Sequence, residues 1–271
     1  MTHIAPIRSA LFLPASNARA VAKARTLACD LVILDLEDAV AEGDKAEARA
    51  AAVAASNENW GDRLLAVRLN GAESNWHDAD LAAVARLPGL DLIVLPKVDD
   101  PLAVRHVGER AGMPILAMIE TAAGVYAARQ IAAEHAVAGL IAGVNDLAAA
   151  LRIPVGAGRA ALEPSLHLIL LAARAAGKLA LDGVYNRLDD AEGFAADARA
   201  GQRAGFDGKS LIHPDQIEPC NRLFVPSEAD IEEARALVAA ATGGAERFRG
   251  RMIETLHVDS ARTLLARADV A

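Results

Sequence analysis

The chain has 271 residues, of which 53% are hydrophobic and 24% charged, and its formal net charge is −8. This composition is typical of a globular protein, and a negative charge without a basic cluster argues against nucleic acids and anionic membranes as main partners. No apolar run approaches the ~18 residues that cross a bilayer, and the N-terminus lacks a secretory-signal pattern. We therefore expect a cytoplasmic protein whose two cysteines, Cys29 and Cys220, are inert thiols.

Apolar runs of strand length alternate with amphipathic, alanine-rich segments along most of the chain. The eight predicted strands are 9–14, 31–37, 64–69, 91–97, 114–120, 138–144, 179–185 and 206–213. The predicted helices between them are 17–28, 44–55, 75–86, 101–110, 122–134, 146–151 with 161–176, and 189–203. Because no hairpin signal joins two of these strands, parallel pairing through helical crossovers is favoured.

Eight strand–helix units predict an α/β fold, a closed (β/α)₈ TIM barrel, which needs about 250 residues. An open doubly wound sheet is the alternative, but no Gly-rich phosphate-binding turn follows the first strand. We predict a barrel domain over residues 1–223 and a C-terminal helical extension over residues 224–271. The extension is long enough to cover the barrel or to reach a neighbouring subunit.

Charged residues collect at the C-terminal ends of the predicted strands, where barrel enzymes place their chemistry. In chain order they are Asp35, Glu37, Asp38, Arg68, Lys97, Glu120, Asp146, Lys209 and His213. Packing alone does not readily explain such a set, so the C-terminal mouth of the barrel is the candidate site.

Glu120 and Asp146 are the candidate metal ligands. Each ends an apolar strand, and two such strands can bring their carboxylates to one hard cation, for which we expect Mg²⁺ with Mn²⁺ as the alternative. Two carboxylates leave coordination positions open for water and a chelating substrate. The absence of His-x-x-x-His or paired-Cys spacing argues against zinc. The alternative interpretation is that each acid only caps the helix after it.

Arg68 lies within an apolar strand, where an unpaired guanidinium would be costly to bury. Its partner is either an acid of the second strand or a substrate carboxylate held through two hydrogen bonds. We expect Glu37 and Asp38 to pair with Arg68 or Lys97, or to hold metal-bound water, rather than to ligate the metal directly.

Seven short motifs carry a resemblance to a known family. They are residues 8–14 (RSALFLP), 34–40 (LDLEDAV), 67–70 (VRLN), 95–97 (LPK), 118–121 (MIET), 145–147 (NDL) and 208–217 (GKSLIHPDQI). With these motifs in order from about residue 7 to the C-terminus, the chain resembles the citrate lyase beta-subunit-like proteins of the 2-keto acid aldolase/citrate lyase superfamily.

The resemblance implies a Mg²⁺-dependent (β/α)₈ barrel, trimeric or hexameric, that makes or breaks a carbon–carbon bond between an acyl-thioester and a 2-keto acid. It implies that Glu120 and Asp146 bind the metal and that Arg68 contacts the keto acid and the developing oxyanion. The expected substrate is a 3-hydroxyacyl-CoA such as citramalyl-, malyl- or citryl-CoA, which the lyase reaction converts to acetyl-CoA and a 2-keto acid.

The chain departs from the family pattern at two positions. Members that act on coenzyme A thioesters usually carry Met-Ile-Asp in the tail, and this aspartate serves a neighbouring subunit's site as acid/base. Here the run is Met252-Ile253-Glu254, so Glu254 is the candidate, and a displacement of about an ångström can cost about 10²-fold in rate. The second departure is Asn145, where the family often has an acid.

These departures leave two alternative functions open. One is a class II pyruvate-dependent aldolase that uses no coenzyme A. The other is a catalytically weak subunit that binds an acyl carrier protein or other lyase subunits.

Overall fold

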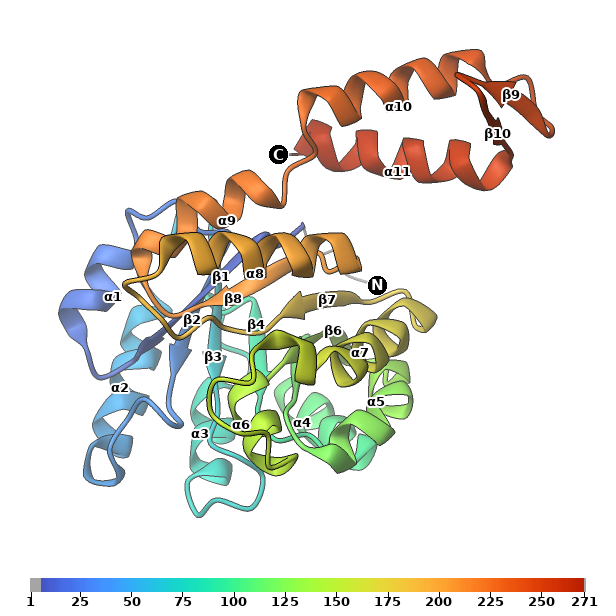
Figure 1. Cartoon of the computed structure of the whole chain (residues 1–271). Helices are drawn as coiled ribbons and strands as arrows, with labels where there is room; N and C mark the ends of the chain where they lie inside the picture. Colours follow the sequence, from blue (N-terminus) through green and yellow to red (C-terminus); the bar gives the residue numbers. More distant parts are fainter. Residues whose placement is uncertain (1–5, 271) are drawn as a thin grey trace.

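The computed structural model describes residues 6–270, and its eight parallel strands form one closed barrel in sequence order (Figure 1). Residues 1–5, where the predicted barrel domain begins, lie outside the described residues. Residue 271, where the predicted extension ends, also lies outside them. The strands are β1 (Ser9–Pro14), β2 (Leu31–Asp35), β3 (Leu64–Arg68), β4 (Leu92–Leu95), β5 (Ile115–Ile119), β6 (Val137–Ala142), β7 (Leu179–Asp182) and β8 (Gly208–Leu211). The predicted (β/α)₈ barrel is confirmed.

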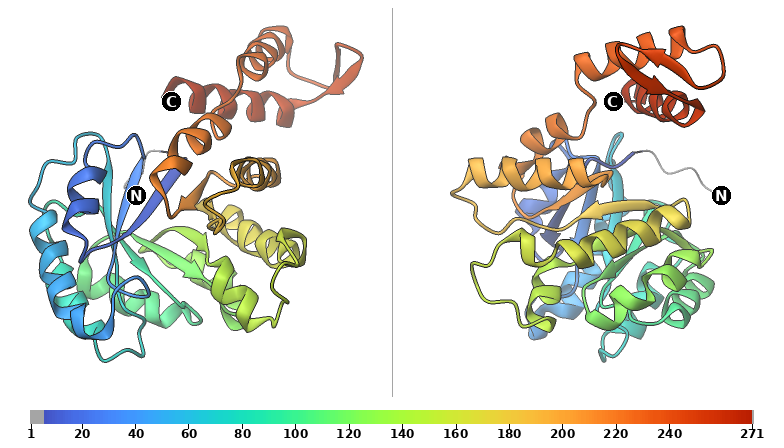
Figure 2. Two further views of the ribbon diagram at one scale, coloured as in Figure 1. Left: turned by 60° about the vertical axis from the view of Figure 1, so that its left-hand side comes forward. Right: turned by 45° about the vertical axis from the view of Figure 1, so that its right-hand side comes forward.

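Helices follow the strands and cover the outer face of the barrel (Figure 2). They are α1 (Ala18–Ala24), α2 (Lys45–Ala55), α3 (His77–Val84), α4 (Pro101–Ala111), α5 (Ala122–Ala133), α6 (Val144–Ala150), α7 (Glu163–Ala175) and α8 (Ala191–Ala204), with 3₁₀ turns η1 (Glu42–Asp44) and η2 (Arg159–Ala161). The ends of α4 show why the helices stop and start where they do. Asp100 accepts a hydrogen bond from the Leu102 amide, and Gly112 ends the helix at a φ of 65°.

Successive residues of each strand face opposite sides of the barrel wall. The inward-facing residues, among them Ile33 of β2 and Met118 of β5, form a core inside the barrel, separate from the core between strands and helices. Asp35 follows Ile33 by two residues and Glu120 follows Met118 by two residues, so both face inward at the C-terminal ends of their strands. Arg68 has the corresponding position at the end of β3. Side chains at these last inward positions therefore meet at the C-terminal mouth of the barrel.

Several strands end earlier than the sequence predicted. β2 ends at Asp35 rather than residue 37, because the Asp35 carboxylate accepts hydrogen bonds from the amides of Glu37 and Ala39 and turns the chain into the next loop. β4 likewise ends at Leu95, two residues before Lys97. The acids and bases of the site thus lie on loops as well as on strand ends.

The C-terminal residues fold into a separate layer beyond the barrel (Figures 1 and 2). After η3 (Pro214–Gln216) and α9 (Ile217–Leu223) come α10 (Glu228–Ala240), β9 (Glu246–Phe248), β10 (Arg251–Ile253) and α11 (Thr255–Val270). Leu237, Ile253, Val258 and neighbouring side chains of this tail form a small core of their own. The predicted extension contains helices α10 and α11, and between them lies an antiparallel β9–β10 hairpin that was not predicted, because its three-residue strands are too short to give a periodic signal.

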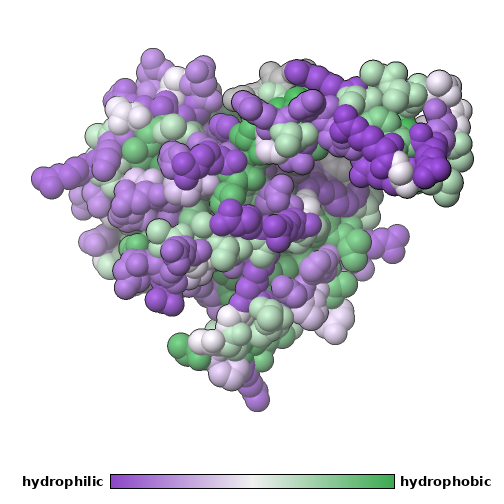
Figure 3. Space-filling view, turned by 45° about the horizontal axis from the view of Figure 1, so that its top comes forward, coloured by the Kyte–Doolittle hydropathy of each residue, from purple (hydrophilic) through white to green (hydrophobic). Residues whose placement is uncertain are grey.

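The molecular surface is mixed in character. In Figure 3 hydrophilic residues are spread over the visible face, with smaller hydrophobic areas between them. Within residues 6–270, no helix has the length and apolar character needed to pass through a bilayer.

Candidate active site at the barrel mouth

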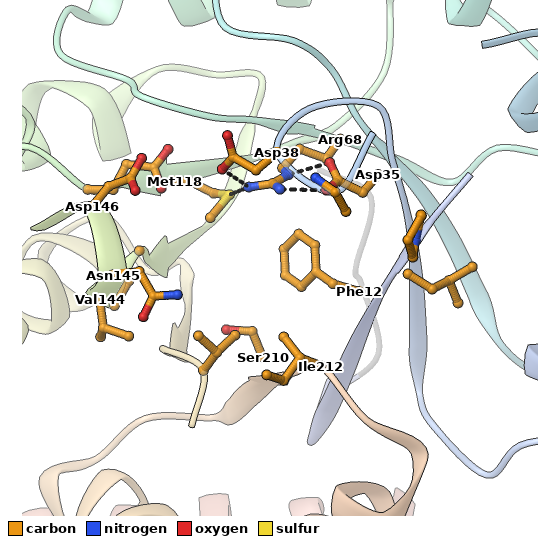
Figure 4. Close-up of a pocket in the computed structure, with 17 residues that line it drawn as sticks. Phe12, Asp35, Asp38, Arg68, Met118, Val144, Asn145, Asp146, Ser210 and Ile212 are labelled. Carbon is orange, nitrogen blue, oxygen red and sulfur yellow. Dashed lines mark hydrogen bonds and ion pairs between the residues drawn. The ribbon is translucent and has the colours of Figure 1, made fainter. Parts of the chain in front are cut away.

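A pocket of about 370 Å³ opens at the C-terminal ends of the barrel strands (Figure 4). One wall is charged, the other is largely apolar. The residues that line it are Phe12, Leu13, Pro14, Asp35, Asp38, Ala39, Arg68, Met118, Glu120, Ala142, Gly143, Val144, Asn145, Asp146, Val184, Ser210 and Ile212. Five of the nine predicted strand-end charges therefore meet in one cavity, namely Asp35, Asp38, Arg68, Glu120 and Asp146.

Arg68 is fixed by an acid of the second strand, which was one of its two predicted partners. Its Nε and Nη2 each donate a hydrogen bond of 2.6 Å to the Asp35 carboxylate. Its Nη1 lies 3.1 Å from Glu37 Oε2 and 3.6 Å from Asp38 Oδ2, and the guanidinium lies over the Phe12 ring, 5.2 Å from the centroid. Burial tends to lower the pKa of Arg68, but the hydrogen bonds and charge of Asp35 outweigh it and raise the pKa.

Lys97 joins the acids of this wall to one another. Its Nζ donates to Glu37 Oε1 at 2.7 Å and lies 3.7 Å from Asp38 and 3.5 Å from Asp146. Its backbone has a φ of 51°, which is unusual for a residue other than glycine and is found at sites where the surrounding structure holds it. The prediction left open whether Glu37 pairs with Arg68 or with Lys97; in the structure it contacts both. Burial raises the pKa of Glu37.

Glu120 is almost completely buried, at 3% exposure. Its Oε1 accepts a 2.7 Å hydrogen bond from the Lys97 amide. On its other side lies Gly143, where a Cβ atom would come within 2.4 Å of Oε2. Burial, with smaller contributions from the charges of Glu37 and Asp146, raises the pKa of Glu120 to about 7. A buried carboxylate with so little hydrogen-bond support favours a positive partner.

Asp146 is the third residue of α6, and its side chain is about two-fifths exposed toward the pocket. The cap of α6 is Gly143, and the cap of α5 is Thr121, whose side chain accepts from the Gly124 amide. The alternative interpretation, in which Asp146 and Glu120 serve only as helix caps, is therefore wrong.

The two carboxylates fit a small divalent cation. Both line one pocket and both contact Lys97, and the negative charge of Asp146 contributes to the raised pKa of Glu120. Within residues 6–270, no group of three or more His, Cys, Asp or Glu side chains is arranged to hold a metal. A cation bound by Glu120 and Asp146 would have to complete its coordination with water and substrate, which suits Mg²⁺.

Four of the nine strand-end charges are not among the lining residues. Glu37 and Lys97 contact residues that line the pocket, whereas Lys209 and His213 have other partners. Lys209 is fully buried behind β8, where its Nζ lies 3.1 Å from Asp182 and also donates to Asp197 of α8. His213 accepts a hydrogen bond from the Asp215 amide and caps η3. Both residues stabilise the barrel rather than contribute to the cavity.

Glu254 also lies away from the cavity of its own chain. It is exposed at the start of α11, and its amide donates to His257 Nδ1. It is not among the residues that line the pocket. Other lining residues carried no signal as site residues in the sequence; Ile212 and Val184, for example, follow ordinary apolar strands.

Comparison with known proteins identifies the family. A family model described as HpcH/HpaI aldolase/citrate lyase matches residues 8–214, and one described as a C–C bond lyase of the TIM-barrel fold matches residues 167–271. The chain belongs to the HpcH/HpaI aldolase/citrate lyase family. The resemblance seen in the sequence motifs is thereby confirmed.

Members of the family with named functions match nearly the whole chain. A (3S)-malyl-CoA thioesterase of Cereibacter sphaeroides is 42% identical, over 99% of this chain and 97% of the relative. The structure of CitE from Mycobacterium tuberculosis with magnesium, acetoacetate and coenzyme A superposes with a TM-score of 0.84 at 35% identity, covering 98% and 99% of the two chains. The citrate lyase beta subunit of that organism, solved with oxaloacetate and magnesium, has a TM-score of 0.72 at 36% identity, covering 82% and 97%.

Proposed function

We propose that this protein is a Mg²⁺-dependent carbon–carbon lyase that cleaves or forms a 3-hydroxyacyl-CoA, with acetyl-CoA and a 2-keto acid as the other partners. The observation that carries the proposal is the meeting of Glu120 and Asp146 in one pocket with a fixed arginine. Relatives solved with magnesium, coenzyme A, acetoacetate or oxaloacetate support the same ligand classes.

Glu120 and Asp146 would hold the metal, with Mn²⁺ as an alternative ion. When bound, such an ion polarises the oxygens of a chelating ligand and lowers the cost of an alkoxide. The Lys97 amide keeps Glu120 Oε1 in place, and the Lys97 ammonium moderates the charge of Asp146 and Glu37. The charged side of the pocket therefore carries more acids than bases, and a divalent cation would offset most of this excess negative charge.

Arg68 would contact the keto-acid part of the substrate. Asp35 holds two of its nitrogens, so the guanidinium keeps a fixed orientation, and Nη1 is the nitrogen not bonded to Asp35. A cation fixed in this way can stabilise negative charge that develops on a nearby oxygen without reorganising. Phe12 and Ile212 form the apolar side of the cavity, which limits water around the reacting bond.

We propose that the tail, residues 224–271, is a unit that serves a neighbouring copy of the chain in a trimer or hexamer. Its separate core and the exposed position of Glu254 support this role. Glu254 would then act as the acid or base for the substrate carbon in the neighbour's pocket.

A second function concerns the same substrate class. Hydrolysis of the thioester, which would convert a malyl-CoA to malate and free coenzyme A, is favoured by the name of the Cereibacter sphaeroides relative. It is also favoured by Glu254, because the longer side chain would displace the carboxyl group from the position of the usual aspartate.

Product analysis separates these reactions. The protein is incubated with Mg²⁺ and malyl-, citramalyl- or citryl-CoA, and free thiol, keto acid and acetyl-CoA are measured in parallel. A lyase releases a keto acid and acetyl-CoA in equal amounts without free thiol, whereas a thioesterase releases free thiol without keto acid. If the protein instead condenses pyruvate with a free aldehyde, the aldolase is favoured. If it turns over none of these substrates but binds an acyl carrier protein, the catalytically weak subunit is favoured.

A further inference from the structure

Two asparagines, one in α6 and one in the segment between β7 and α8, form a reciprocal amide pair at the edge of the pocket. Asn145 is the second residue of α6, and Asn186 lies in the segment between β7 and α8. Asn186 Nδ2 donates to Asn145 Oδ1 at 2.6 Å, and Asn145 Nδ2 donates to Asn186 Oδ1 at 3.4 Å. The pair therefore contains one short and one long hydrogen bond.

The short bond orients the Asn145 amide. Asn186 Nδ2 holds the Asn145 Oδ1 in place. Of the two N–H groups of Asn145 Nδ2, one points to Asn186 Oδ1 in the long bond, and the other has no acceptor among residues 6–270. Figure 4 shows this nitrogen turned toward the open middle of the pocket. A neutral hydrogen-bond donor thus faces the cavity one residue from the candidate metal ligand Asp146.

The segment that carries Asn186 is itself held in place. Gln216 donates to the Tyr185 carbonyl at 2.9 Å, and the Tyr185 hydroxyl donates to Asp190 at 2.7 Å. Asn186 is therefore anchored on the residue before it, so it can act as a support that fixes the Asn145 side chain.

Both candidate reactions build negative charge on the thioester oxygen. In the cleavage, a base removes the 3-hydroxyl proton, the bond between C2 and C3 breaks, and its electron pair moves to C2 and the thioester oxygen as an enolate. A proton added to C2 then gives acetyl-CoA. In the hydrolysis, a base takes one proton from water as the water adds to the thioester carbon, and the carbonyl oxygen carries the negative charge. Collapse then expels the coenzyme A thiolate, which takes that proton back from the base.

We propose that Asn145 is a catalytic residue whose Nδ2 donates a hydrogen bond to the substrate's thioester oxygen, and that Asn186 is the positioning residue that orients it. The inference rests on the proposed function, because it requires a thioester in this pocket. A fixed neutral donor stabilises an oxyanion, whereas an acid at residue 145 would present an acceptor and repel it.

Kinetics of four variants test the proposal. Asn145→Ala should lower kcat about 10²-fold with little change in KM, and Asn186→Ala should lower it roughly tenfold. Asn186→Asp can only accept hydrogen bonds, so it should turn the Asn145 amide and lower kcat as far as Asn145→Ala. Asn57→Ala, at an exposed amide beyond the end of α2 that bonds the Val53 carbonyl, should leave kcat unchanged.

A spectroscopic measurement tests the contact without turnover. The infrared carbonyl band of bound [1-¹³C]acetyl-CoA should lie at lower frequency in the wild type than in Asn145→Ala, with Asn186→Asp resembling the latter. The same band in wild type and Asn145→Ala, or an unchanged kcat in an active enzyme, would overturn this inference alone. Failure of the wild type to bind acetyl-CoA or to turn over any thioester would overturn the proposed function and this inference together.

Discussion

Asp35 and Arg68 are register partners at the ends of β2 and β3, and the two oxygens of the Asp35 carboxylate each accept a 2.6 Å hydrogen bond from the guanidinium. The same carboxylate accepts hydrogen bonds from the amides of Glu37 and Ala39. One buried acid therefore fixes both the arginine of the pocket and the loop that carries Glu37.

Replacing this acid by its neutral isostere should destabilise the protein. Asp35→Asn leaves Arg68 buried without its charge partner, and breaking a buried pair costs about 3–5 kcal/mol. Urea unfolding of the variant measures the loss. Glu218→Gln is the matched control, because it breaks the exposed pair between Glu218 and Arg222, and such pairs contribute about 0–1 kcal/mol. An equally small loss for both variants would show that the Asp35–Arg68 pair does not stabilise the fold.

Gly143→Ala should weaken metal binding and also destabilise the barrel, because the added Cβ would clash with the Glu120 Cβ, which is attached directly to the backbone. A Cβ at this position would lie 2.4 Å from both Cβ and Oε2 of Glu120, so the carboxylate has to move out of place. Calorimetric titration with Mg²⁺ should show a loss of affinity of at least about tenfold, in line with the 10–100-fold effects of changes that disturb ligand orientation.

The control for this substitution is Gly43→Ala in η1, where no atom lies within 4 Å of the added Cβ. It should bind Mg²⁺ like the wild type. Wild-type affinity in Gly143→Ala would contradict the assignment of Glu120 as a metal ligand.

The sequence was sufficient to predict the barrel and the place of its site. Apolar strands such as β2 and β5 end in a carboxylate, and parallel strands bring their C-terminal ends to one mouth. Period-two alternation explains why Asp35 and Glu120 face inward. The partner of Arg68 could not be chosen in the same way, because it depends on the long-range register between β2 and β3.

The expectation that charges at strand ends line the pocket failed at β8, because the sequence did not show which of its residues face into the barrel. Ser210 of β8 lines the pocket, so Lys209, one residue earlier, faces the opposite side and pairs with Asp182 and Asp197. The Asn145–Asn186 pair could not be predicted for another reason. It joins α6 to a loop residue 41 positions later in the sequence, and loop conformations do not follow from hydrophobic periodicity.

The stability of the metal-free protein should depend on pH through Glu120. Burial raises the pKa of this carboxyl from an ordinary 4.5 to about 7. Between these pH values the folded chain holds a proton that the unfolded chain has lost, so stability falls as pH rises through this window. Glu120→Gln cannot lose a proton and should match the wild type near pH 4 but exceed it by up to about 3 kcal/mol at pH 8.

Thermal unfolding in EDTA across pH 4–8 measures this difference. Glu73→Gln, at an exposed position in the loop between β3 and α3, controls for the loss of one negative charge. Added Mg²⁺ should narrow the gap at pH 8, because it stabilises only a folded chain that can bind it. If the stability difference between Glu120→Gln and the wild type stays constant with pH, burial does not raise the pKa of Glu120 in the folded protein.

Mixing two inactive variants should restore activity if the tail serves a neighbouring subunit. Glu254→Ala lacks the proposed acid/base but keeps an intact pocket, whereas Glu120→Gln lacks a metal ligand but keeps an intact tail. In a mixed oligomer, a Glu254→Ala pocket can receive the Glu254 of a Glu120→Gln neighbour. Unfolding and refolding the two variants together at equal amounts should yield about a quarter of wild-type turnover, because both requirements are met at one interface in four with random assembly.

The control is a chain that carries both substitutions, refolded with wild type at the same ratio. In this control mixture a site is complete only where the pocket of a wild-type chain receives the tail of another wild-type chain. Random assembly again gives about one such interface in four. A shared site therefore predicts equal recovery of activity in both mixtures. A site built within one chain would leave the mixture of single variants inactive while the control mixture kept half of the wild-type rate. The exposed position of Glu254 outside its own pocket favours the shared site.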